Sequence, residues 1–504
     1  MKDIMNASTM KTNDLYRQDK LFIAGEWVAP LDGRMADSID PSTGQVWAQV
    51  VFAGTRDMDR AVDAANSALR GPWSKWSPAQ RAALLRKIGE VIEANIEHLA
   101  QIETRDNGML LSDARKNVQS LAQYWYYFSG LADKLEGRNI PVDDGYFAYT
   151  TRVPVGVVGA ILPWNAPLQM VTWKLAPALA AGCTMVIKSA EQTPVSAYEF
   201  AKLIQDLGIP PGVVSIVSGI GAEVGRHLSA HPGVNKISFT GEHRTAMDIM
   251  RTGAVNLKRY SFECGGKAPH IIFDDANVDQ AINAATHSAF ALCGQSCALG
   301  SRLLVQRGAY DRVVEEIARR ASKLRVGRPQ DSATHMGPQA HQAQLSKTLE
   351  YIGIGQAEGA QLLAGGQRVS SSDLEGGYYV TPTVFGNVNN SMRIAREEIF
   401  GPVVSAIPFD SEEEAVAIAN DTEYGLTAGL WTNDLGRAHR VSSQIQAGTV
   451  WVNTYRFLRW SIPYGGFKVS GLGRENGMEA LDAYLQTRAT IVGTNATYPD
   501  VFSV

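Results

Sequence analysis

Five short apolar runs decide the fold of this chain: VGAIL (158–162), TMVIKS (184–189), VVSIVSG (213–219), KISFTG (236–241) and RYSFECGG (259–266). Segments with a helical spacing of apolar residues separate the runs. This alternation predicts βαβ units and a parallel sheet with helices on both faces. Ligands of such sheets bind beyond the carboxyl ends of the strands, so the chemistry is expected in the loops that carry Asn165, Lys188, Gly221 and Gly241.

A second series of the same kind follows the fifth run. HIIF (270–273) should form a strand, a helix should run from about Val278 to Cys293, and RLLVQ (302–306) should form the next strand before another helix. The chain is therefore expected to contain a second α/β domain.

The region ahead of the first run is mostly helical. LFIAGEW (21–27) is typical of two short extended pieces, and a helix is then expected to begin at Pro78, directly after a serine, and to stop near Gly108. A second helical region is expected over residues 112–135.

The bulk composition excludes several classes of function. With 504 residues, of which 45% are hydrophobic and 19% are charged, the chain is long enough for two or three domains. The formal net charge of -4, the sequence pI of about 6.2 and the dispersed Lys and Arg residues argue against nucleic acid and against an anionic membrane as partners. Residues 1–20 lack the apolar core of a secretory signal, and no apolar stretch reaches the roughly 20 residues that span a bilayer.

The cysteines also bear on location and on metal binding. Cys183, Cys264, Cys293 and Cys297 are too few and too clustered for the disulfide framework of a secreted scaffold, so a cytoplasmic protein is expected. No second Cys or His pair stands at zinc-ligand spacing from Cys293 and Cys297, so no metal site is expected.

The run FALCGQSCALGSR (290–302) carries the strongest chemical signal. Alone, a cysteine beside a glycine is more often a small core residue than a nucleophile. Six further motifs accompany the run: PWN (163–165), KSAEQTP (188–194), FTG (239–241), ECGGK (263–267), EEIFGP (397–402) and PYGGFKVSGLGRE (463–475). In this order and spacing, the seven motifs resemble the aldehyde dehydrogenase superfamily from about Phe22 to Val492.

The resemblance implies that an aldehyde is oxidised to a carboxylic acid through Cys297, the match to the family's nucleophile. A thiolate adds to the aldehyde carbon to give a hemithioacetal, whose oxyanion can expel hydride to nicotinamide and leave a thioester. Glu263 matches the general base that activates the hydrolytic water. Asn165 matches the side-chain amide that stabilises the oxyanion together with the backbone N–H of the nucleophile. Without the other motifs, Asn165 would be interpreted as a turn residue.

The resemblance also implies a site for NAD. Glu191 matches the carboxylate that accepts hydrogen bonds from the adenosine ribose, and a carboxylate there should repel a 2′-phosphate, which favours NAD over NADP. The glycine-rich segment 219–225 departs from the GxGxxG spacing and is weak evidence alone. The full set that the resemblance assigns to the cofactor is Trp164, Lys188, Glu191, Gly221, Gly225, Gly241, Glu242, Glu398 and Phe400.

Two positions depart from the pattern of the family. Glu242 follows FTG where a small hydroxyl residue often helps to hold the pyrophosphate, so weaker cofactor binding is expected. Cys264 replaces the usual apolar residue after the catalytic glutamate and is expected to pack in the core, as is Cys183. Cys293 either packs on an apolar helical face or serves as a resolving redox thiol for Cys297, and packing is favoured.

Six residues are placed along the aldehyde entry tunnel by the resemblance: Ala166, Gln169, Met170, Trp173, Leu458 and Tyr464. Ala166 occupies a site often filled by an aromatic ring and Gln169 one often filled by leucine, which predicts a wider, more polar tunnel and a preference for bulky, aromatic or acidic aldehydes over acetaldehyde. The loop TYRFLRWSI (454–462) adds Arg456 and Arg459. Such arginines are usually surface charges, but an arginine at the tunnel mouth would give a substrate carboxylate a charge-assisted contact.

The expected fold is α/β, with two doubly wound domains and a small β element for oligomerisation. A Rossmann-like NAD-binding domain is expected over residues 1–135 and 155–265, and a catalytic domain over 266–483. The oligomerisation element is expected over 136–154 and 484–504, where segments typical of exposed strands occur, and such strands commonly pair with another subunit. A homodimer or a homotetramer is implied by the resemblance.

Two alternative functions stay open. In a CoA-acylating dehydrogenase, CoA would take the acyl group and no base for water would be needed, so Glu263 argues against this reading. A catalytically silent NAD-binding or structural relative is the other alternative, and the retention of Cys297, Asn165 and Glu263 argues against it.

Overall fold

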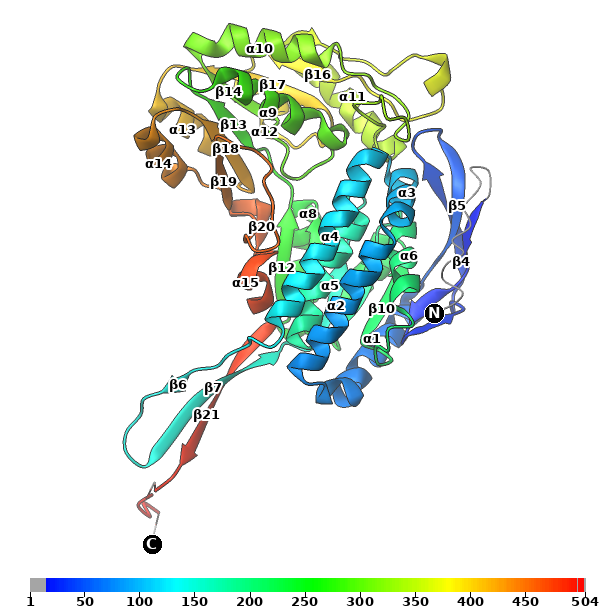
Figure 1. The fold of residues 1–504 in the computed structure, drawn as a ribbon, viewed down its shortest axis with the longest axis vertical. Coiled ribbons are helices and arrows are strands. Elements are labelled where there is room, and N and C mark those ends of the chain that lie inside the picture. Colours follow the sequence, from blue (N-terminus) through cyan, green and yellow to red (C-terminus); the bar gives the residue numbers. More distant parts are fainter. Residues whose placement is uncertain (1–14, 496, 503–504) are drawn as a thin grey trace.

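The computed structural model describes residues 15–495 and 497–502. Its larger sheet has the strand order β20-β12-β11-β8-β9-β10-β2-β3 (Figure 1). The five apolar runs form the parallel centre of this sheet, as the sequence predicts. These strands are β8 (Val157–Ile161), β9 (Thr184–Ser189), β10 (Val214–Ser218), β11 (Lys236–Gly241) and β12 (Arg259–Cys264).

Short antiparallel strands close both edges of this sheet. LFIAGEW forms β2 (Leu21–Ile23) and β3 (Glu26–Val28) on the β10 side, as expected. On the other side, β20 (Gly471–Leu472) pairs with β12. β20 lies inside the range 266–483 that was expected to form the catalytic domain, so the chain returns to the first sheet before that range ends.

Helices cover the sheet on both faces. α5 (Pro167–Ala181) is apolar almost all round and therefore lies buried, with α4 packed over it. The helices of this part are α1 (Thr55–Arg70), α2 (Pro78–Ala94), α3 (Ile96–Asn107), α4 (Leu111–Leu131), α5, α6 (Val195–Ile204), α7 (Arg226–Ala230) and α8 (His243–Gly253).

The helix expected from Pro78 to Gly108 is in fact two helices. α2 begins as predicted, with Ser77 accepting a hydrogen bond from the backbone N–H of Gln80. Asn95 interrupts the run, because its backbone leaves the helical region (φ -121°, ψ 23°) and its side chain donates to the Val91 carbonyl. α3 then ends at Gly108, which adopts a left-handed φ of 81°.

The second sheet has the order β15-β16-β17-β14-β13-β18-β19 and confirms the predicted second α/β unit. HIIF and RLLVQ form its parallel strands β13 and β14. The strands are β13 (Pro269–Ile272), β14 (Arg302–Gln306), β15 (Gln361–Ala364), β16 (Thr383–Gly386), β17 (Val403–Phe409), β18 (Thr427–Trp431) and β19 (Thr449–Val452). The main helices are α9 (Val278–Phe290), α10 (Arg307–Ala321), α11 (Gln342–Ala357), α13 (Glu412–Asn420) and α14 (Leu435–Gln444).

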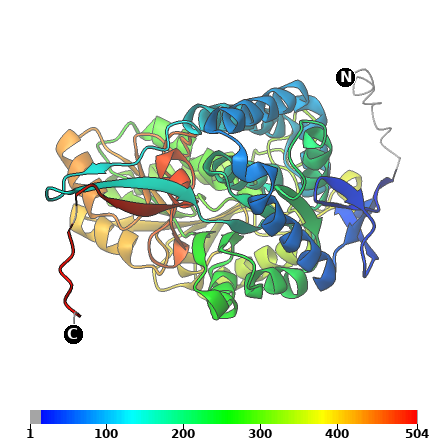
Figure 2. The same ribbon diagram turned by 90° about the horizontal axis from the view of Figure 1, so that it is seen from below.

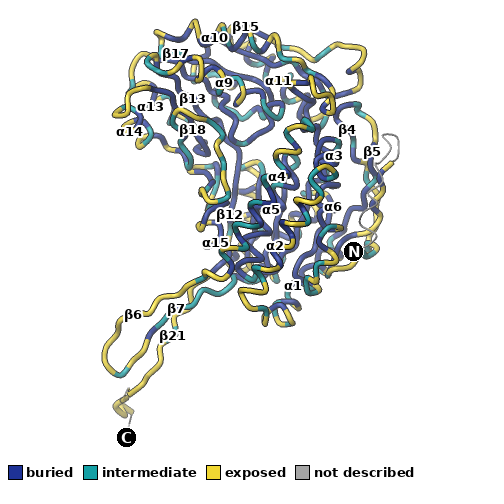
Figure 3. The backbone as a smooth tube through the Cα atoms, viewed as in Figure 1, coloured by how far each residue is buried: buried dark blue, intermediate teal, exposed yellow. Residues whose placement is uncertain are grey.

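A three-stranded sheet extends away from both units (Figure 1). It consists of β6 (Asn139–Ile140), β7 (Tyr146–Pro154) and β21 (Leu485–Gly493), and most of its surface is exposed (Figure 3). The exposed strands predicted from the sequence are thus confirmed, and their pairing with another subunit stays a prediction. A further sheet of β1 (Tyr16–Gln18), β4 (Arg34–Asp40) and β5 (Gln45–Phe52) lies at the opposite side of the molecule (Figure 2).

None of the helices in the described part of the chain combines the length and the apolar content that crossing a membrane requires.

Candidate active site

Cys297 lies in the loop that leads from α9 into β14. α9 ends because Ala291 leaves the helical region (ψ 144°), and the next two residues, the second of them Cys293, have left-handed φ values of 55°. Gly294 (φ 71°) then brings the chain close to Gly401. A Cβ on Gly294 would lie 2.2 Å from the carbonyl carbon of Gly401. The Cys297 Sγ is partly exposed and lies 3.3 Å from the Tyr464 hydroxyl.

Cys293 is a buried core residue that lies beyond the end of α9. The expected helical face shared with Phe290 is wrong, because α9 ends at Phe290. The Cys293 Sγ instead accepts a hydrogen bond from the Gln339 side chain at 3.0 Å. Cys183 and Cys264 are buried, as expected.

Glu263 is the penultimate residue of β12 and is only 1% exposed. Neither oxygen of its carboxylate has a hydrogen-bond partner among the described residues. Burial raises the pKa of Glu263 to about 7. Burial, followed by the charge of Glu263, also raises the pKa of the Cys297 thiol. The two side chains therefore share one desolvated pocket, in which a neutral thiol faces a carboxylate that is a base near neutral pH.

A buried ion pair lies behind this carboxylate. The Lys174 Nζ of α5 lies 2.8 Å from a carboxylate oxygen of Glu475, and both side chains are almost fully buried. The charge of Lys174 lowers the pKa of Glu263, and that of Glu475 raises it. Sequence analysis missed this pair, although a lone lysine in the apolar helix that begins PLQMVTWK (167–174) was a usable signal.

Asn165 follows β8 and faces the loop of the nucleophile. Its side-chain amide donates to the carbonyl of Gln295, two residues before Cys297, at 3.0 Å. Two residues of α3 hold the Asn165 loop from behind. Asn107 donates to the Asn165 carbonyl (3.3 Å), and Glu103 accepts the backbone N–H of Leu168 in the first turn of α5, directly after the loop (3.1 Å). Sequence analysis missed both residues of α3, because nothing local in a helix shows which loop it supports.

A groove with charged walls lies at the carboxyl ends of β9 and β10. The buried Lys188 donates to Glu191 at 2.7 Å. Burial acts to raise the pKa of Glu191, but the charge and the hydrogen bond of Lys188, together with backbone N–H groups, outweigh it, so the pKa is lowered. Above this pair, a Cβ on Gly221 would meet nothing closer than 3.7 Å, and one on Gly225 nothing closer than 3.9 Å. A Cβ on either glycine would thus be in ordinary van der Waals contact with its neighbours, which are the ion pair for Gly221 and Ile161 for Gly225.

Trp164 and Phe400 lie together at one side of this groove, with ring centroids 5.3 Å apart. His341, which sequence analysis missed, packs edge-on against Trp164 at 4.8 Å. Its Nδ1 accepts the backbone N–H of Gln344, and its buried Nε2 has no hydrogen-bond partner among the described residues. Burial lowers the pKa of His341 to about 4, so the ring stays neutral at physiological pH.

Glu398 closes the other side and depends on the glycines of ECGGK. A carboxylate oxygen of Glu398 accepts the backbone N–H of Gly266 at 2.9 Å. A Cβ on Gly265 would lie 2.1 Å from the same carboxylate, so only glycine permits this approach. Burial raises the pKa of Glu398. Adjacent Glu397 points elsewhere and pairs with Arg393 at 2.9 Å.

Glu242 stands at the start of α8, directly after Gly241 at the end of β11. Its side chain is 57% exposed and lies 3.8 Å from the Arg244 guanidinium. Its charge also adds to the raised pKa of Glu398, so it faces the same groove. Arg244 therefore offsets part of the repulsion that was expected from Glu242.

Two of the residues expected along the tunnel lie near Cys297. Trp173 and Tyr464 are buried, with ring centroids 5.6 Å apart, and Tyr464 contacts Cys297. Tyr124 and Trp460, which sequence analysis missed, extend this aromatic wall, because the Tyr124 ring lies 5.8 Å from Trp173 and 6.0 Å from Trp460. The other expected members are buried or partly exposed: Ala166, Met170, Gln169 and Leu458.

A sequence profile described as the aldehyde dehydrogenase family matches residues 27–490 of the chain. The chain belongs to this family. An aldehyde dehydrogenase of Emericella nidulans is 43% identical to it, over 93% of this chain and 94% of the fungal one. The NAD+ complex of a Bacillus cereus aldehyde dehydrogenase is 42% identical and has a TM-score of 0.92, covering 94% of this chain and 96% of that one. Betaine aldehyde dehydrogenase of Staphylococcus aureus with NAD+ is 37% identical, with a TM-score of 0.95 and 97% coverage of both chains.

These likenesses confirm the α/β fold of the aldehyde dehydrogenase and its general activity, the oxidation of an aldehyde.

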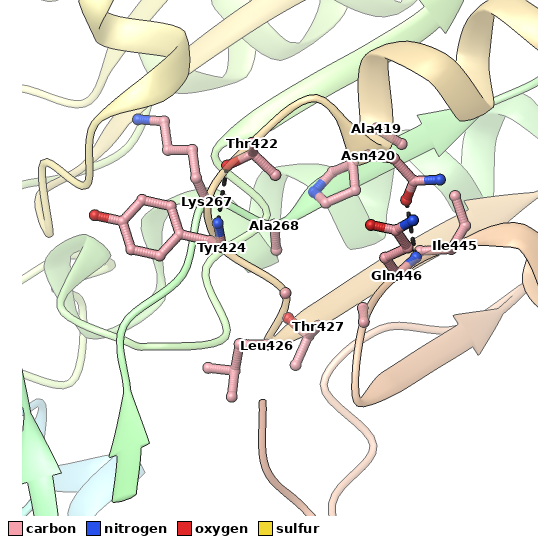
Figure 4. A pocket seen from close by; sticks show the side chains of 13 residues that line it. Lys267, Ala268, Ala419, Asn420, Thr422, Tyr424, Leu426, Thr427, Ile445 and Gln446 are labelled. Carbon is pink, nitrogen blue, oxygen red and sulfur yellow. Dashed lines mark hydrogen bonds between the residues drawn. The ribbon is translucent and has the colours of Figure 1, made fainter. Parts of the chain in front are cut away.

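Lys267, the last residue of ECGGK, lies at the edge of the site. It lines a small pocket with residues 419–427 and Gln446 (Figure 4). Its Nζ is buried without a hydrogen-bond partner among the described residues, and burial lowers its pKa to about 7.

One group of metal-ligating side chains occurs among the described residues of the enzyme, on α1 and at the end of α7. An oxygen of Asp59 lies 2.5 Å from the His227 Nε2 and 3.3 Å from the His231 Nε2. The His231 Nδ1 accepts the backbone N–H of Gly233 at 3.0 Å. A metal on the Nε2 of His231 would require a proton on that Nδ1, so the hydrogen bond opposes metal binding.

The buried Glu103 of α3 predicts a pH-dependent stability. Burial raises its pKa from 4.5 to about 7, so the folded protein retains a proton that the unfolded chain loses. This contribution is complete below pH 4.5 and is lost as the pH rises to about 7. Between about pH 5 and about pH 8, the melting temperature of the wild type should therefore fall more than that of Glu103→Gln. The difference corresponds to a change in the free energy of unfolding on the order of 1–3 kcal/mol.

The control is Glu97→Gln on the same helix. Glu97 is exposed, and Arg115 lowers its pKa to about 2, so it is ionised throughout this range. Thermal melting monitored by tryptophan fluorescence measures both variants. Equal pH slopes for Glu103→Gln and Glu97→Gln would show that Glu103 does not carry the proton.

Proposed function

We propose that this enzyme oxidises an aldehyde to a carboxylate with NAD, through a hemithioacetal and then a thioester on Cys297, and that Glu263 is the general base. The observation that carries the proposal is the shared pocket of the two side chains. A carboxylate with no hydrogen bond of its own and a pKa of about 7 lies where its charge acts on the thiol.

The groove beside β9 and β10 supports NAD as the cofactor. Gly221 lies beside the Lys188–Glu191 pair, Glu191 would accept hydrogen bonds from the adenosine ribose, and Glu398 would bind the nicotinamide ribose. When bound, NAD supplies the hydride acceptor. Relatives of this chain with 42% and 37% identity bind NAD+. Trp164 and Phe400 would flank the cofactor, and Glu242 would lie near the pyrophosphate.

Each protein group has a defined task in the proposed reaction. Glu263 takes the proton of the Cys297 thiol, and the thiolate attacks the aldehyde carbon. The side-chain amide of Asn165, which donates to a carbonyl two residues from Cys297, is placed to donate to the oxyanion. After oxidation, Glu263 passes the thiol proton to solvent and then takes a proton from water, and the resulting hydroxide cleaves the thioester to release the carboxylate and the Cys297 thiolate. A pKa of about 7 suits both proton transfers.

The two alternatives account for fewer of these features. A CoA-acylating enzyme needs no base for water, and it leaves the burial of Glu263 beside Cys297 without a purpose. A silent relative needs neither the pocket nor the amide of Asn165. Activity without CoA, followed through NADH formation with a panel of aldehydes, separates all three functions.

The first prediction concerns the nucleophile. Cys297→Ala should lower turnover by at least about 1,000-fold, because the hemithioacetal cannot form, and the fold should persist because the Cys297 side chain is partly exposed. Cys293→Ala is the matched control, since its Sγ lies in the core, where it accepts a hydrogen bond from the side chain of Gln339. If Cys293→Ala loses turnover and Cys297→Ala keeps it, the nucleophile has been misplaced.

The second prediction concerns the base. In Glu263→Gln, rapid mixing should show a first burst of NADH of about one equivalent per active site, followed by a steady state slower by about 100- to 10,000-fold, because the thioester is not hydrolysed. In the wild type, kcat should rise with pH through about 7 as Glu263 ionises. Mass spectrometry should detect the acyl adduct in the variant.

The control for the base is Glu397→Gln, since Glu397 pairs with Arg393 outside the pocket. It should show normal turnover and no trapped adduct. Normal steady-state turnover of Glu263→Gln would contradict the assignment of Glu263 as the base.

The third prediction concerns cofactor choice. Glu191→Gln should raise kcat/KM with NADP relative to NAD by about tenfold or more, because the repulsion of a 2′-phosphate is removed while an acceptor is kept. Glu223→Gln is the control, since Glu223 lies on the neighbouring turn but pairs with Arg34 at 2.8 Å. An unchanged NADP/NAD ratio in Glu191→Gln would mean that this carboxylate does not face the ribose.

A further inference from the structure

The loop after β19 holds Arg456 in one conformation. Arg456 has a left-handed φ of 58°, which a non-glycine residue keeps only where its neighbours fix the backbone. Both neighbours are fixed here. The Tyr455 ring stacks on His270 with centroids 4.5 Å apart, and the Trp451 side chain donates to the Phe457 carbonyl at 3.1 Å.

The guanidinium of Arg456 has unused binding capacity. Its Nη1 is buried but has no hydrogen-bond partner, and no ion pair of Arg456 occurs within residues 15–495 and 497–502. A buried donor without a partner costs free energy that a ligand can recover. Arg459, in the same loop, differs because it donates to the Leu458 carbonyl at 2.9 Å and lies 4.5 Å over the Phe457 ring.

The charge of Arg456 acts inside the aldehyde tunnel. Burial and the charges of Cys297 and Glu263 raise the pKa of Tyr464, and the charge of Arg456 opposes that rise. Tyr464 is the residue whose hydroxyl lies 3.3 Å from the Cys297 Sγ. The loop of Arg456 also borders the tunnel geometrically, because Trp460 of the same loop packs edge-on against Tyr124 of the aromatic wall, with ring centroids 6.0 Å apart.

Little negative charge competes for Arg456 on the facing helices. Burial and the charge of Arg456 both lower the pKa of His287 on α9. Asp113 of α4 is the acidic group that acts on the same histidine, and it lies 4.0 Å from Lys116. Arg456 and Arg459 therefore leave this end of the tunnel positively charged.

The aromatic side chains along the tunnel favour a substrate with a flat or apolar body, but they do not favour a negatively charged one. Tyr124, Trp173, Trp460 and Tyr464 offer flat faces to an apolar or aromatic body. Aromatic faces also attract cations, but two guanidinium groups in the adjoining loop would repel a cationic substrate.

We infer that Arg456 binds the carboxylate of an acidic aldehyde, so that the preferred substrates carry a carboxylate at the end remote from the carbonyl group. This inference rests on the proposed function, because the aldehyde end of the substrate must reach Cys297. The carboxylate supplies the partner that Nη1 lacks, and the aromatic wall contacts the body of the molecule.

The first test compares three aldehydes with the wild-type enzyme: 4-carboxybenzaldehyde, 4-methylbenzaldehyde of nearly the same shape, and cationic betaine aldehyde. The acid should exceed the methyl compound in kcat/KM by about 10- to 100-fold at low salt, as expected for a hydrogen bond to a charged group. The difference should shrink in about 0.5 M NaCl, because salt screens the charges. Equal values, or a clear advantage of betaine aldehyde, would overturn the inference.

The second test uses matched variants of the two arginines. Arg456→Gln should lower the ratio of kcat/KM for the acid to that for the methyl compound by about tenfold or more, mainly through KM, and Arg456→Lys should restore part of it. Arg459→Gln removes the same charge from the same loop and should change the ratio by less than about threefold. Equal effects of Arg456→Gln and Arg459→Gln would assign the preference to general charge and overturn the role of Arg456.

Failure of this inference is distinguishable from failure of the proposed function. If 4-methylbenzaldehyde and NAD give no NADH with the wild type, the proposed function itself fails. If the methyl compound is oxidised and the acid has no advantage, only the role of Arg456 fails. The wild-type comparison also decides the question if Arg456→Gln does not fold.

Discussion

The structure depends on the burial of one carboxylate, that of Glu263, which has no nitrogen or oxygen donor as a hydrogen-bond partner among the described residues. Glu263 lies near the end of β12, closed off from water, and this burial raises its pKa. Burial of the thiol, followed by the charge of Glu263, raises the pKa of Cys297. Such burial costs free energy, so the surrounding structure must compensate for it. The Lys174–Glu475 ion pair lies behind the carboxylate, and the charge of Lys174 lowers the pKa of Glu263.

The backbone around this pocket is held by contacts from distant parts of the chain. α3 supports the Asn165 loop through Asn107 and Glu103, and it also binds the start of α6 through Asp106, which accepts the Val195 N–H at 2.9 Å. One helix thus fixes the loop that faces the nucleophile and the segment that follows Glu191. Rigid support of this kind is what catalytic geometry requires.

The proposed cofactor site and the proposed tunnel mouth differ in charge. Glu191 is paired with Lys188 at the end proposed to hold the adenosine ribose, whereas Arg456 and Arg459 are the cations proposed for the tunnel mouth. The ring contacts and the unpartnered Nη1 make these two arginines chemically different, although they are three residues apart in one loop.

The sequence by itself determined the parallel sheet and the order of its strands along the chain, because alternating apolar runs depend on residues near one another. Local motifs likewise singled out Cys297, Glu263 and Asn165 as the candidate catalytic residues. Only the tertiary structure decided the break at Asn95, the return of β20 to the first sheet, the position of Cys293 beyond α9, the Lys174–Glu475 pair and the difference between Arg456 and Arg459. Each of these depends on which distant groups a side chain or strand meets, and on the water that is excluded there. Local periodicity carries no information about contacts between residues that lie hundreds of positions apart.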